Sequence, residues 1–254
     1  MTQPKLQLVA IKKRLRGRQV LDGVDIDVAP GKSLVIIGGS GVGKSVTLKC
    51  ALGLMKPDAG QVLVDGADVT RMPAEIRARV MRKFGMLFQG GALFDSLTVW
   101  ENIAFRLLYA DKVSRQDARE RAIDAMRKVR LTADFADVRP IELSGGMQKR
   151  AGLARAIIAK PDILFFDEPT TGLDPITADA INDLIVEQCK ELGCAAVSIT
   201  HDMASARKIA DEIAMLYAGR IVWRGPASAI DHSDNPMVDQ FVAGRAEGPI
   251  QAVV

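Results

Sequence analysis

Gly38-Gly39-Ser40-Gly41-Val42-Gly43-Lys44-Ser45 is the stretch that decides the fold. It follows the apolar run 33–37 and precedes a helical pattern that begins at Lys44. Glycines let successive backbone N–H groups point at phosphate oxygens, while Lys44 can reach the β- and γ-phosphates and Ser45 can ligate Mg²⁺. The stretch predicts a nucleoside triphosphate site at a strand-to-helix turn, and a glycine-rich turn that holds no ligand is the alternative. The residues assigned to nucleotide binding are Gly38, Gly39, Ser40, Gly41, Val42, Gly43, Lys44, Ser45 and Val46.

The composition indicates a globular protein with one large core. The chain has 254 residues, of which 48% are hydrophobic, and a formal net charge of +3. This charge is too small to argue for a nucleic-acid partner. Three cysteines without a Cys-x-x-Cys pair suggest neither a disulfide framework nor a zinc site, and they favour a reducing cytoplasm. Because no apolar run approaches the roughly 18 residues that span a bilayer, we expect any work at a membrane to require a membrane partner.

The order of patterns along the chain predicts an α/β fold. Short strands separated by turn residues suggest an antiparallel layer, a helical stretch follows, and alternating strands and helices then return. Continuous apolar runs in the last part are typical of parallel strands covered on both faces. We therefore predict a single domain with a mostly parallel sheet, an antiparallel β layer and an inserted α-helical subdomain. Its predicted parts are a nucleotide-binding core at 1–95 and 160–225, a helical subdomain at 96–159 and a tail at 226–254.

Polar residues follow three of the predicted buried strands. Asp167 and Glu168 come directly after 163–166, Gln89 follows 85–88, and His201 follows 195–199 by two positions. A carboxylate pair at the end of a buried strand is costly unless a cation or strong donors meet it, and Mg²⁺ held by a triphosphate would do so. The alternatives are that Asp167 and Glu168 cap a turn and that His201 only satisfies a local hydrogen bond.

These four residues suit the chemistry of triphosphate hydrolysis. Asp167 can bind Mg²⁺ directly or through water, and Glu168 can orient or deprotonate the attacking water. Gln89 can bridge the metal and the water, and His201 can donate a hydrogen bond to the γ-phosphate. We therefore predict Glu168, His201 and Gln89 as catalytic residues and Ser45, Gln89 and Asp167 as metal ligands.

Leu143-Ser144-Gly145-Gly146 stands at the start of another helical pattern. Ser144 suits the N-cap, and Met147, Ala151, Ala154 and Ile158 form the predicted apolar face. The N–H groups at such a helix start suit a phosphate, although a simple serine cap is the alternative for this segment taken alone.

The motifs together resemble those of ABC-transporter ATPases. The phosphate loop, Gln89, the Leu143 to Gly146 segment, Asp167-Glu168, Gly172-Leu173-Asp174 and His201 occur in the order of that family. The resemblance implies ATP and Mg²⁺ as cofactors and a head-to-tail homodimer with ATP between its subunits. It also implies that Ser144, Gly145 and Gly146 contact the γ-phosphate held by the partner chain, and that Asp174 lies in a loop between the two sites.

Three positions depart from the family's usual pattern. Val46 stands where threonine is common, Met147 replaces the usual glutamine, and no aromatic residue lies near Leu15 to stack on adenine. We expect adenine to rely instead on Leu15 and the flanking Arg14 or Arg16.

A narrower resemblance concerns the cargo. The segments 86–94, 143–147 and 235–244 are similar to those of ATPase subunits in Mla-type phospholipid-trafficking systems. This similarity implies a multi-spanning permease, an MCE-type lipid-binding protein and a STAS-domain regulatory subunit as partners. It implies a location at the cytoplasmic face of the inner membrane, held there by the permease, and transport of phospholipid between the inner and outer membranes. The alternatives are another cargo, or a soluble ABC protein that acts on nucleic acid or ribosomes.

Two apolar features have alternative interpretations. Met237, Val238, Phe241 and Val242 form a stripe on a short predicted helix that starts at Asn235, and this stripe can dock on its own domain or on a partner. Leu93, Phe94 and Trp100 can line a groove for a permease helix, or Trp100 can belong to the core.

Overall fold

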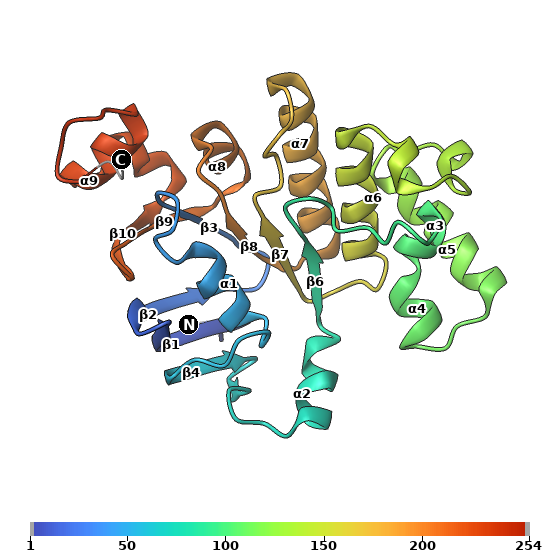
Figure 1. Cartoon of the computed structure of the whole chain (residues 1–254), viewed down its shortest axis with the longest axis horizontal. Coiled ribbons are helices and arrows are strands. Elements are labelled where there is room, and N and C mark those ends of the chain that lie inside the picture. The colour runs from blue at the N-terminus through green and yellow to red at the C-terminus, as the bar shows by residue number, and fades with distance from the viewer. Residues whose placement is uncertain (1–2, 252–254) are drawn as a thin grey trace. The chain divides into compact units, whose positions relative to one another are not determined.

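The computed structural model describes residues 3–251, which form two compact units. Unit 1 contains residues 3–81 and 197–251, and unit 2 contains residues 82–196. Figure 1 shows the helices and strands of both units along the chain. The boundaries expected from the sequence at residues 96, 160 and 226 stay a prediction.

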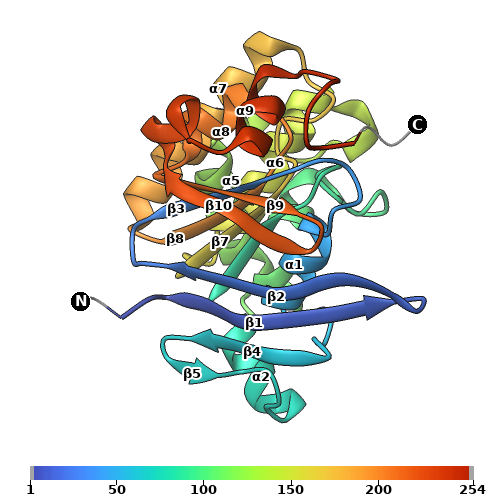
Figure 2. The ribbon, with the colours of Figure 1, turned by 90° about the vertical axis from the view of Figure 1, so that its left-hand side faces the viewer.

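One sheet of unit 1 is the antiparallel layer that the sequence predicts. Its strands occur in the order β2-β1-β4-β5, and β1 pairs antiparallel with β2 and with β4 (Figure 2). Apolar side chains alternate along β1, so that Leu6 and Leu8 are buried while Gln7 between them is more exposed. The strand bounds are β1 Leu6–Leu15, β2 Arg18–Val28, β4 Ala59–Val64 and β5 Ala67–Asp68.

The other strands of unit 1 carry the predicted phosphate loop. They follow the order β10-β9-β3-β8, with β3 parallel to β9 and β9 antiparallel to β10. Val35 and Ile36 of β3 are both fully buried, as expected for a strand covered on both faces. The strands are β3 Ser33–Ile37, β8 Ala195–Ile199, β9 Glu212–Tyr217 and β10 Arg220–Pro226, and the last three residues of β8 belong to this unit. The helices are α1 Lys44–Ala51, α2 Ala74–Met81, α8 Met203–Ile209, the 3₁₀ helix η3 Ala227–His232 and α9 Pro236–Ala243.

Unit 2 has two parallel strands and most of the helices. In the register of β6 and β7, Leu87 is the partner of Phe166. Four helices, α3 to α6, lie between these strands in the sequence and form the green and yellow cluster of Figure 1. The elements are β6 Phe84–Leu87, α3 Val99–Ile103, α4 Phe105–Tyr109, α5 Arg115–Lys128, η1 Ala133–Phe135, η2 Pro140–Glu142, α6 Gly145–Ile157, β7 Ile163–Asp167 and α7 Pro175–Leu192. The predicted α/β class, with parallel and antiparallel strands and an inserted helical segment, is therefore confirmed.

Helix α6 lies unusually close to strand β6. A Cβ atom added at Gly85 would lie 2.3 Å from the carbonyl oxygen of Ala156, and one added at Gly152 would lie 2.7 Å from the Cδ1 atom of Leu87. Gly85 therefore leaves no room for a side chain against the backbone of α6, whereas a larger residue at Gly152 would have to displace the side chain of Leu87.

The helix caps expected from the sequence are present. The side chain of Ser144 accepts a hydrogen bond from the N–H of Met147, and Asp174 caps α7 through the N–H groups of Ile176 and Thr177. Helix α7 ends at Gly193, whose φ of 62° is in the left-handed region that glycine tolerates. Asn235 and Gly244 cap α9 in the same manner.

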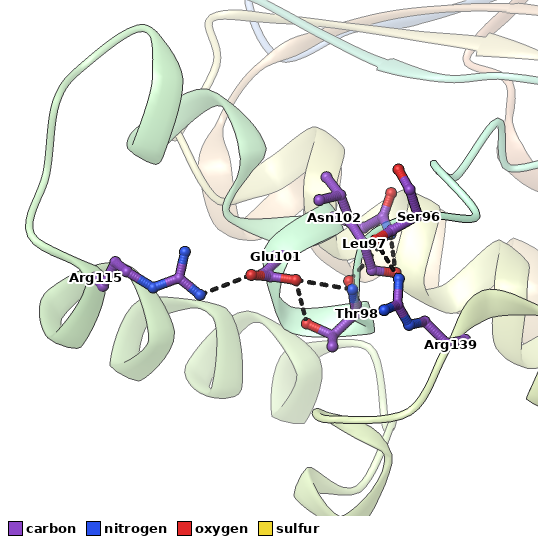
Figure 3. A network of polar contacts seen from close by, with 7 residues as sticks. All are labelled: Ser96, Leu97, Thr98, Glu101, Asn102, Arg115 and Arg139. Carbon is purple, nitrogen blue, oxygen red and sulfur yellow. Dashed lines mark hydrogen bonds and ion pairs between the residues drawn. The ribbon is translucent and has the colours of Figure 1, made fainter.

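A polar network fixes the start of α3 (Figure 3). One carboxylate oxygen of Glu101 accepts hydrogen bonds from the N–H and the hydroxyl of Thr98, at 3.0 and 2.9 Å, and the other oxygen meets Arg115 at 2.7 Å. These donors, first the N–H of Thr98 and then the guanidinium of Arg115, hold the pKa of the Glu101 carboxyl below its usual range. The fully buried Asn102 also donates to the carbonyl oxygen of Phe94 and accepts from its N–H.

The apolar residues that the sequence assigns either to the core or to a partner surface differ in how deeply they are buried. Trp100 is buried, and the guanidinium of Arg115 lies 5.0 Å from the centre of its ring, so Trp100 belongs to the core of unit 2. Phe94 is exposed and stacks on Phe105. In α9, Val238 is buried within its own chain, while the rest of the predicted stripe is half-buried.

Replacing Glu101 with glutamine is expected to lower the free energy of unfolding at neutral pH by about 1–2 kcal/mol, because Thr98 and Arg115 lose an ionised acceptor. A carboxyl with a lowered pKa contributes stability that is present above its unfolded pKa and is lost as the pH falls through the folded pKa. The difference between the wild type and E101Q, measured by urea unfolding, should therefore shrink in acid. Glu120→Gln on the exposed face of α5 is the control, and an equal effect of E120Q, or a difference that does not change with pH, would contradict the assignment.

Candidate nucleotide site

The predicted phosphate loop follows β3 and leads into α1, as the sequence indicates. Three of its glycines have positive φ angles, 149° at Gly38, 76° at Gly41 and 114° at Gly43. A Cβ atom at Gly38 would lie 2.4 Å from the carbonyl oxygen of Leu216, and one at Gly43 would lie 2.8 Å from the Cδ2 atom of Leu21. The loop therefore depends on glycine both for its backbone conformation and for its close contact with neighbouring chain segments.

Lys44 is held over the loop by the loop's own carbonyl groups. Its Nζ atom donates to the carbonyl oxygens of Gly38 and Gly39, at 2.7 and 2.9 Å, and the side chain is buried. Ser45 is exposed beside it. A cation and a hydroxyl thus stand at the start of α1, where helix N–H groups favour an anion.

His201 lies in the same unit as the phosphate loop. Strand β8 is next to β3, and the N–H of Thr200 donates to the carbonyl oxygen of Ile36 at 3.2 Å. Strand β3 ends at Ile37 and β8 ends at Ile199. The fold therefore brings the residues after β8 beside the strand that leads into the phosphate loop. The structure therefore brings together two of the predicted parts of the site.

Gln89, Asp167 and Glu168 lie together in unit 2. Strands β6 and β7 are parallel and in register at Leu87 and Phe166, so their carboxyl ends meet at one edge. Gln89 follows the first strand, and Asp167 ends the second. The polar residues therefore lie at neighbouring strand ends, while their roles in catalysis and metal binding stay predictions.

Glu168 has an unusual backbone conformation. Its φ angle is 49°, in the left-handed region that costs a residue with a Cβ atom of the order of 1 kcal/mol or more. Its side chain is 9% exposed, and one carboxylate oxygen accepts a hydrogen bond from the Thr171 hydroxyl at 3.0 Å. The chain thus maintains an unfavourable conformation in order to hold this carboxylate in a fixed place.

The segment 143–146 and Asp174 also lie together in unit 2. A Cβ atom at Gly146 would lie 2.8 Å from the Cγ2 atom of Thr177, and one at Gly145 would lie 3.6 Å from Leu173. The start of α6 therefore packs against the start of α7, which Asp174 caps. Ser144 and Gly145 are exposed at this surface.

The predicted site residues are therefore divided between the two units. The phosphate loop, Val46 and His201 belong to unit 1, and Gln89, Ser144, Gly145, Gly146, Asp167, Glu168 and Asp174 belong to unit 2. Within residues 3–251 there is no group of three or more His, Cys, Asp or Glu side chains arranged to hold a metal ion. None of the helices in that range is long and apolar enough to cross a membrane.

Sequence reasoning missed two cationic residues that support the site from α6. Lys149 is buried and donates to the carbonyl oxygen of Gln89 and, at 3.3 Å, to that of Glu168. Arg155 donates to the carbonyl oxygens of Gly91 and Ala92, at 2.6 and 2.8 Å. Lys149 lies on the opposite side of the helix from the predicted apolar face, so the helical pattern held no signal for its burial.

Comparison with known families identifies the family to which the chain belongs. The family described as "ABC transporter" matches residues 21–171, more than half of the chain. The chain belongs to the ABC transporter family. The predicted family resemblance is thereby confirmed, and this ABC ATPase binds and hydrolyses ATP as the ATP-binding subunit of a transporter.

Relatives of this ABC ATPase have names that point to different cargoes. It is 36% identical to the "Probable ribonucleotide transport ATP-binding protein mkl" of Mycobacterium leprae, over 96% of this chain and 70% of that protein. It is 37% identical to the "Intermembrane phospholipid transport system ATP-binding protein MlaF" of Escherichia coli K12, over 92% of this chain and 86% of that protein.

Among solved structures, the ATP-binding cassette MJ0796, described as dimeric and bound to ADP and Pi, has a TM-score of 0.80 to this ABC ATPase. The two chains are 30% identical, and the match covers 87% of this chain and 98% of that chain. The agreement extends over nearly all of a cassette.

Lys44→Ala is expected to weaken ATP binding by at least tenfold, since it removes the buried ammonium from the phosphate loop while the other loop residues remain. Lys49→Ala, which removes an exposed lysine later in the same helix, is the matched control. Titration with a fluorescent ATP analogue measures both affinities. Equal affinity of K44A and wild-type protein, with K49A also unchanged, would contradict the assignment of the loop.

Proposed function

We propose that this ABC ATPase powers a phospholipid transporter by closing as a homodimer on two ATP molecules and reopening on hydrolysis. Glu168 activates the attacking water, and Gln89 and His201 are the other proposed catalytic residues. The observation that carries this assignment is the fixed position of the Glu168 carboxylate, which is held by Thr171 on a backbone in the left-handed region. A general base must be placed within hydrogen-bond reach of the water it deprotonates, so a rigid carboxylate suits that role.

Mg²⁺ is the metal that the predicted ligands fit best. Ser45, Gln89 and Asp167 offer a hydroxyl, an amide oxygen and a carboxylate, and Mg²⁺ prefers oxygen ligands together with substrate phosphates. When bound, Mg²⁺ would neutralise charge that develops on the phosphates during hydrolysis. In this proposal Asp167 and Ser45 would hold the metal, and Gln89 would be a further ligand that also orients the attacking water.

A second copy of the chain completes each ATP site in this proposal. We propose that the γ-phosphate bound by the partner's Lys44 is contacted by Ser144, Gly145 and Gly146. Asp174 is proposed to lie between the two ATP sites. The exposed surface around this segment supports the proposal, because Ile141 and Ile176 are each 85% exposed in the single chain. In the proposed dimer the partner chain would cover these exposed apolar side chains.

Adenine is proposed to lie at the tip of the β1–β2 hairpin. Leu15 is half-buried there, and Arg14 and Arg16 are exposed on either side of it. The nearby guanidinium of Arg14 is oriented by a hydrogen bond to Gln19 at 2.9 Å. An apolar contact flanked by cationic groups is the binding mode expected where no aromatic ring is available.

The cargo proposal rests on the similarity to the E. coli relative, of which this chain covers 86%. Its name supports phospholipid as the cargo. We further propose a multi-spanning permease as the membrane partner and a place at the cytoplasmic face of the inner membrane. An MCE-type lipid-binding protein and a STAS-domain subunit complete the proposed assembly. The mycobacterial relatives support ribonucleotide as the second candidate cargo.

The loop that follows Gln89 is the proposed contact for the permease. Phe94 is exposed on it, and the backbone groups of Phe94 are fixed by the buried side chain of Asn102. Arg139 also donates to the carbonyl oxygen of Ser96. An exposed aromatic side chain on a loop fixed in this way suits a permanent contact with a membrane subunit.

Glu168→Gln is expected to abolish most ATP turnover and to leave ATP affinity within about threefold, because the amide keeps the shape of the side chain but cannot accept a proton. Size-exclusion chromatography with Mg²⁺ and ATP should then show a trapped dimer. Glu187→Gln, a carboxylate on α7 that pairs with Arg130, is the matched control. Undiminished turnover in E168Q would show that another group serves as the base.

The cargo can be identified from the transporter purified with this chain as the tagged subunit. We expect a multi-spanning permease and bound phospholipid, detected by mass spectrometry, and an ATPase rate that rises when the complex is placed in phospholipid nanodiscs. Ribonucleotides that stimulate the ATPase in place of phospholipid would favour the second candidate. Recovery of RNA or ribosomes without a membrane protein would contradict transport altogether.

A further inference from the structure

Lys149 is a buried cation that the reaction proposed above does not use. It lies on α6, one helical turn after Gly145, and its side chain is 5% exposed. Burial lowers the pKa of its ammonium group, while the charges of Asp167 and Glu168 act in the opposite direction. An ammonium in such a place is unfavourable unless its three donors meet acceptors.

The acceptors of Lys149 are backbone atoms of the predicted catalytic residues. Its Nζ atom donates to the carbonyl oxygen of Gln89 and to that of Glu168. These two residues follow the carboxyl ends of adjacent parallel strands, so one ammonium connects both strand ends. The carbonyl oxygen of Glu168 also accepts a hydrogen bond from the N–H of Thr171 at 3.3 Å. The conformation that orients Glu168 is therefore fixed from two sides, by Thr171 and by Lys149.

The helix that carries Lys149 has little freedom to move independently of β6. Gly85 brings the backbones of β6 and α6 into close contact, and Gly152 packs against the side chain of Leu87 and the backbone of Gly91. Later on the same helix, Arg155 holds the carbonyl oxygens of Gly91 and Ala92. The segment that begins with Gln89 is thus attached to α6 at two places, and a displacement of α6 must be transmitted to it.

We propose that Lys149 is a positioning residue through which α6 sets the positions of Gln89 and Glu168. The first residues of the same helix, Gly145 and Gly146, are those proposed to meet the ATP of the partner chain. Lys149 then connects the contact with one ATP to the residues that hydrolyse the other. This inference rests on the proposed function, because it requires Glu168 as the base and a head-to-tail dimer.

The test compares Lys149→Met, Lys149→Arg and Arg150→Met in the full chain within its purified transporter. Methionine is close in length to lysine and has no donor, and replacing a buried charge with an apolar side chain is often tolerated by the fold. Arginine restores the charge and donors in another shape. Arg150 is the matched control, because it is the next residue and also donates to two backbone carbonyls, those of Val129 and Arg130.

For K149M we expect kcat to fall by about 10- to 100-fold, the loss typical of a misplaced catalytic group, while KM for ATP stays within about threefold. K149R should recover part of kcat. ATP-dependent dimer formation should persist in K149M, and R150M should keep a kcat within about threefold of wild type. A melting temperature for each variant verifies that it is folded, and Lys149→Gln serves for the same comparison if K149M does not fold.

The proposal is overturned if folded K149M keeps a wild-type kcat, if its loss lies in KM, or if R150M loses as much kcat as K149M. Failure of the proposed function has a different signature. In that case Glu168→Gln retains turnover, or wild-type protein forms no dimer with ATP, whatever the result for Lys149.

Discussion

The backbone of α6 lies directly against the backbone of β6 at Gly85, and the arrangement of the polar residues of unit 2 depends on this close approach. A Cβ atom at Gly85 would lie 2.3 Å from the carbonyl oxygen of Ala156, and one at Gly152 would lie 2.7 Å from the side chain of Leu87. The approach brings a lysine of α6 within hydrogen-bond distance of Gln89 and Glu168. It also aligns the start of α6, with Ser144, against the start of α7. Two glycines without functional groups of their own thus help to place the residues proposed for catalysis.

Burial strengthens the interactions of the charged groups in this region and fixes the positions of these groups. Charges in a poorly solvated place interact strongly and are costly unless they are paired or hydrogen-bonded. Lys149 meets backbone carbonyls, and the Glu168 carboxylate meets the Thr171 hydroxyl. The left-handed φ angle of Glu168 is retained because these contacts offset its cost. The same contacts that stabilise the buried charges therefore also orient them.

The sequence alone predicted the elements that depend on local patterns and missed the contacts that depend on tertiary packing. The caps at Ser144 and Asp174 and the α7 end at Gly193 follow from local hydrogen-bonding and backbone preferences, and all three are present. The strand before the phosphate loop is equally clear from its apolar run. Lys149 was missed because a helical pattern scored by apolar residues treats lysine as solvent-exposed. The left-handed conformation of Glu168 was missed because no glycine or other local pattern marks it, and one of its contacts, with Lys149, depends on tertiary packing.

The N-termini of the helices indicate which of them are prepared for an anion. Among the helices of eight or more residues in the described range 3–251, a carboxylate occupies the N-cap of α7 and the first turn of α2, α5 and α9. Such a carboxylate partly neutralises the positive end of the helix dipole. Helices α1 and α6 have Gly43 and Ser144 as N-cap residues instead, and neither has an acidic residue in its first turn. Because their positive ends are not neutralised from within the helix, α1 and α6 are the helices best suited to meet the phosphates of ATP, one in each half of the proposed shared site.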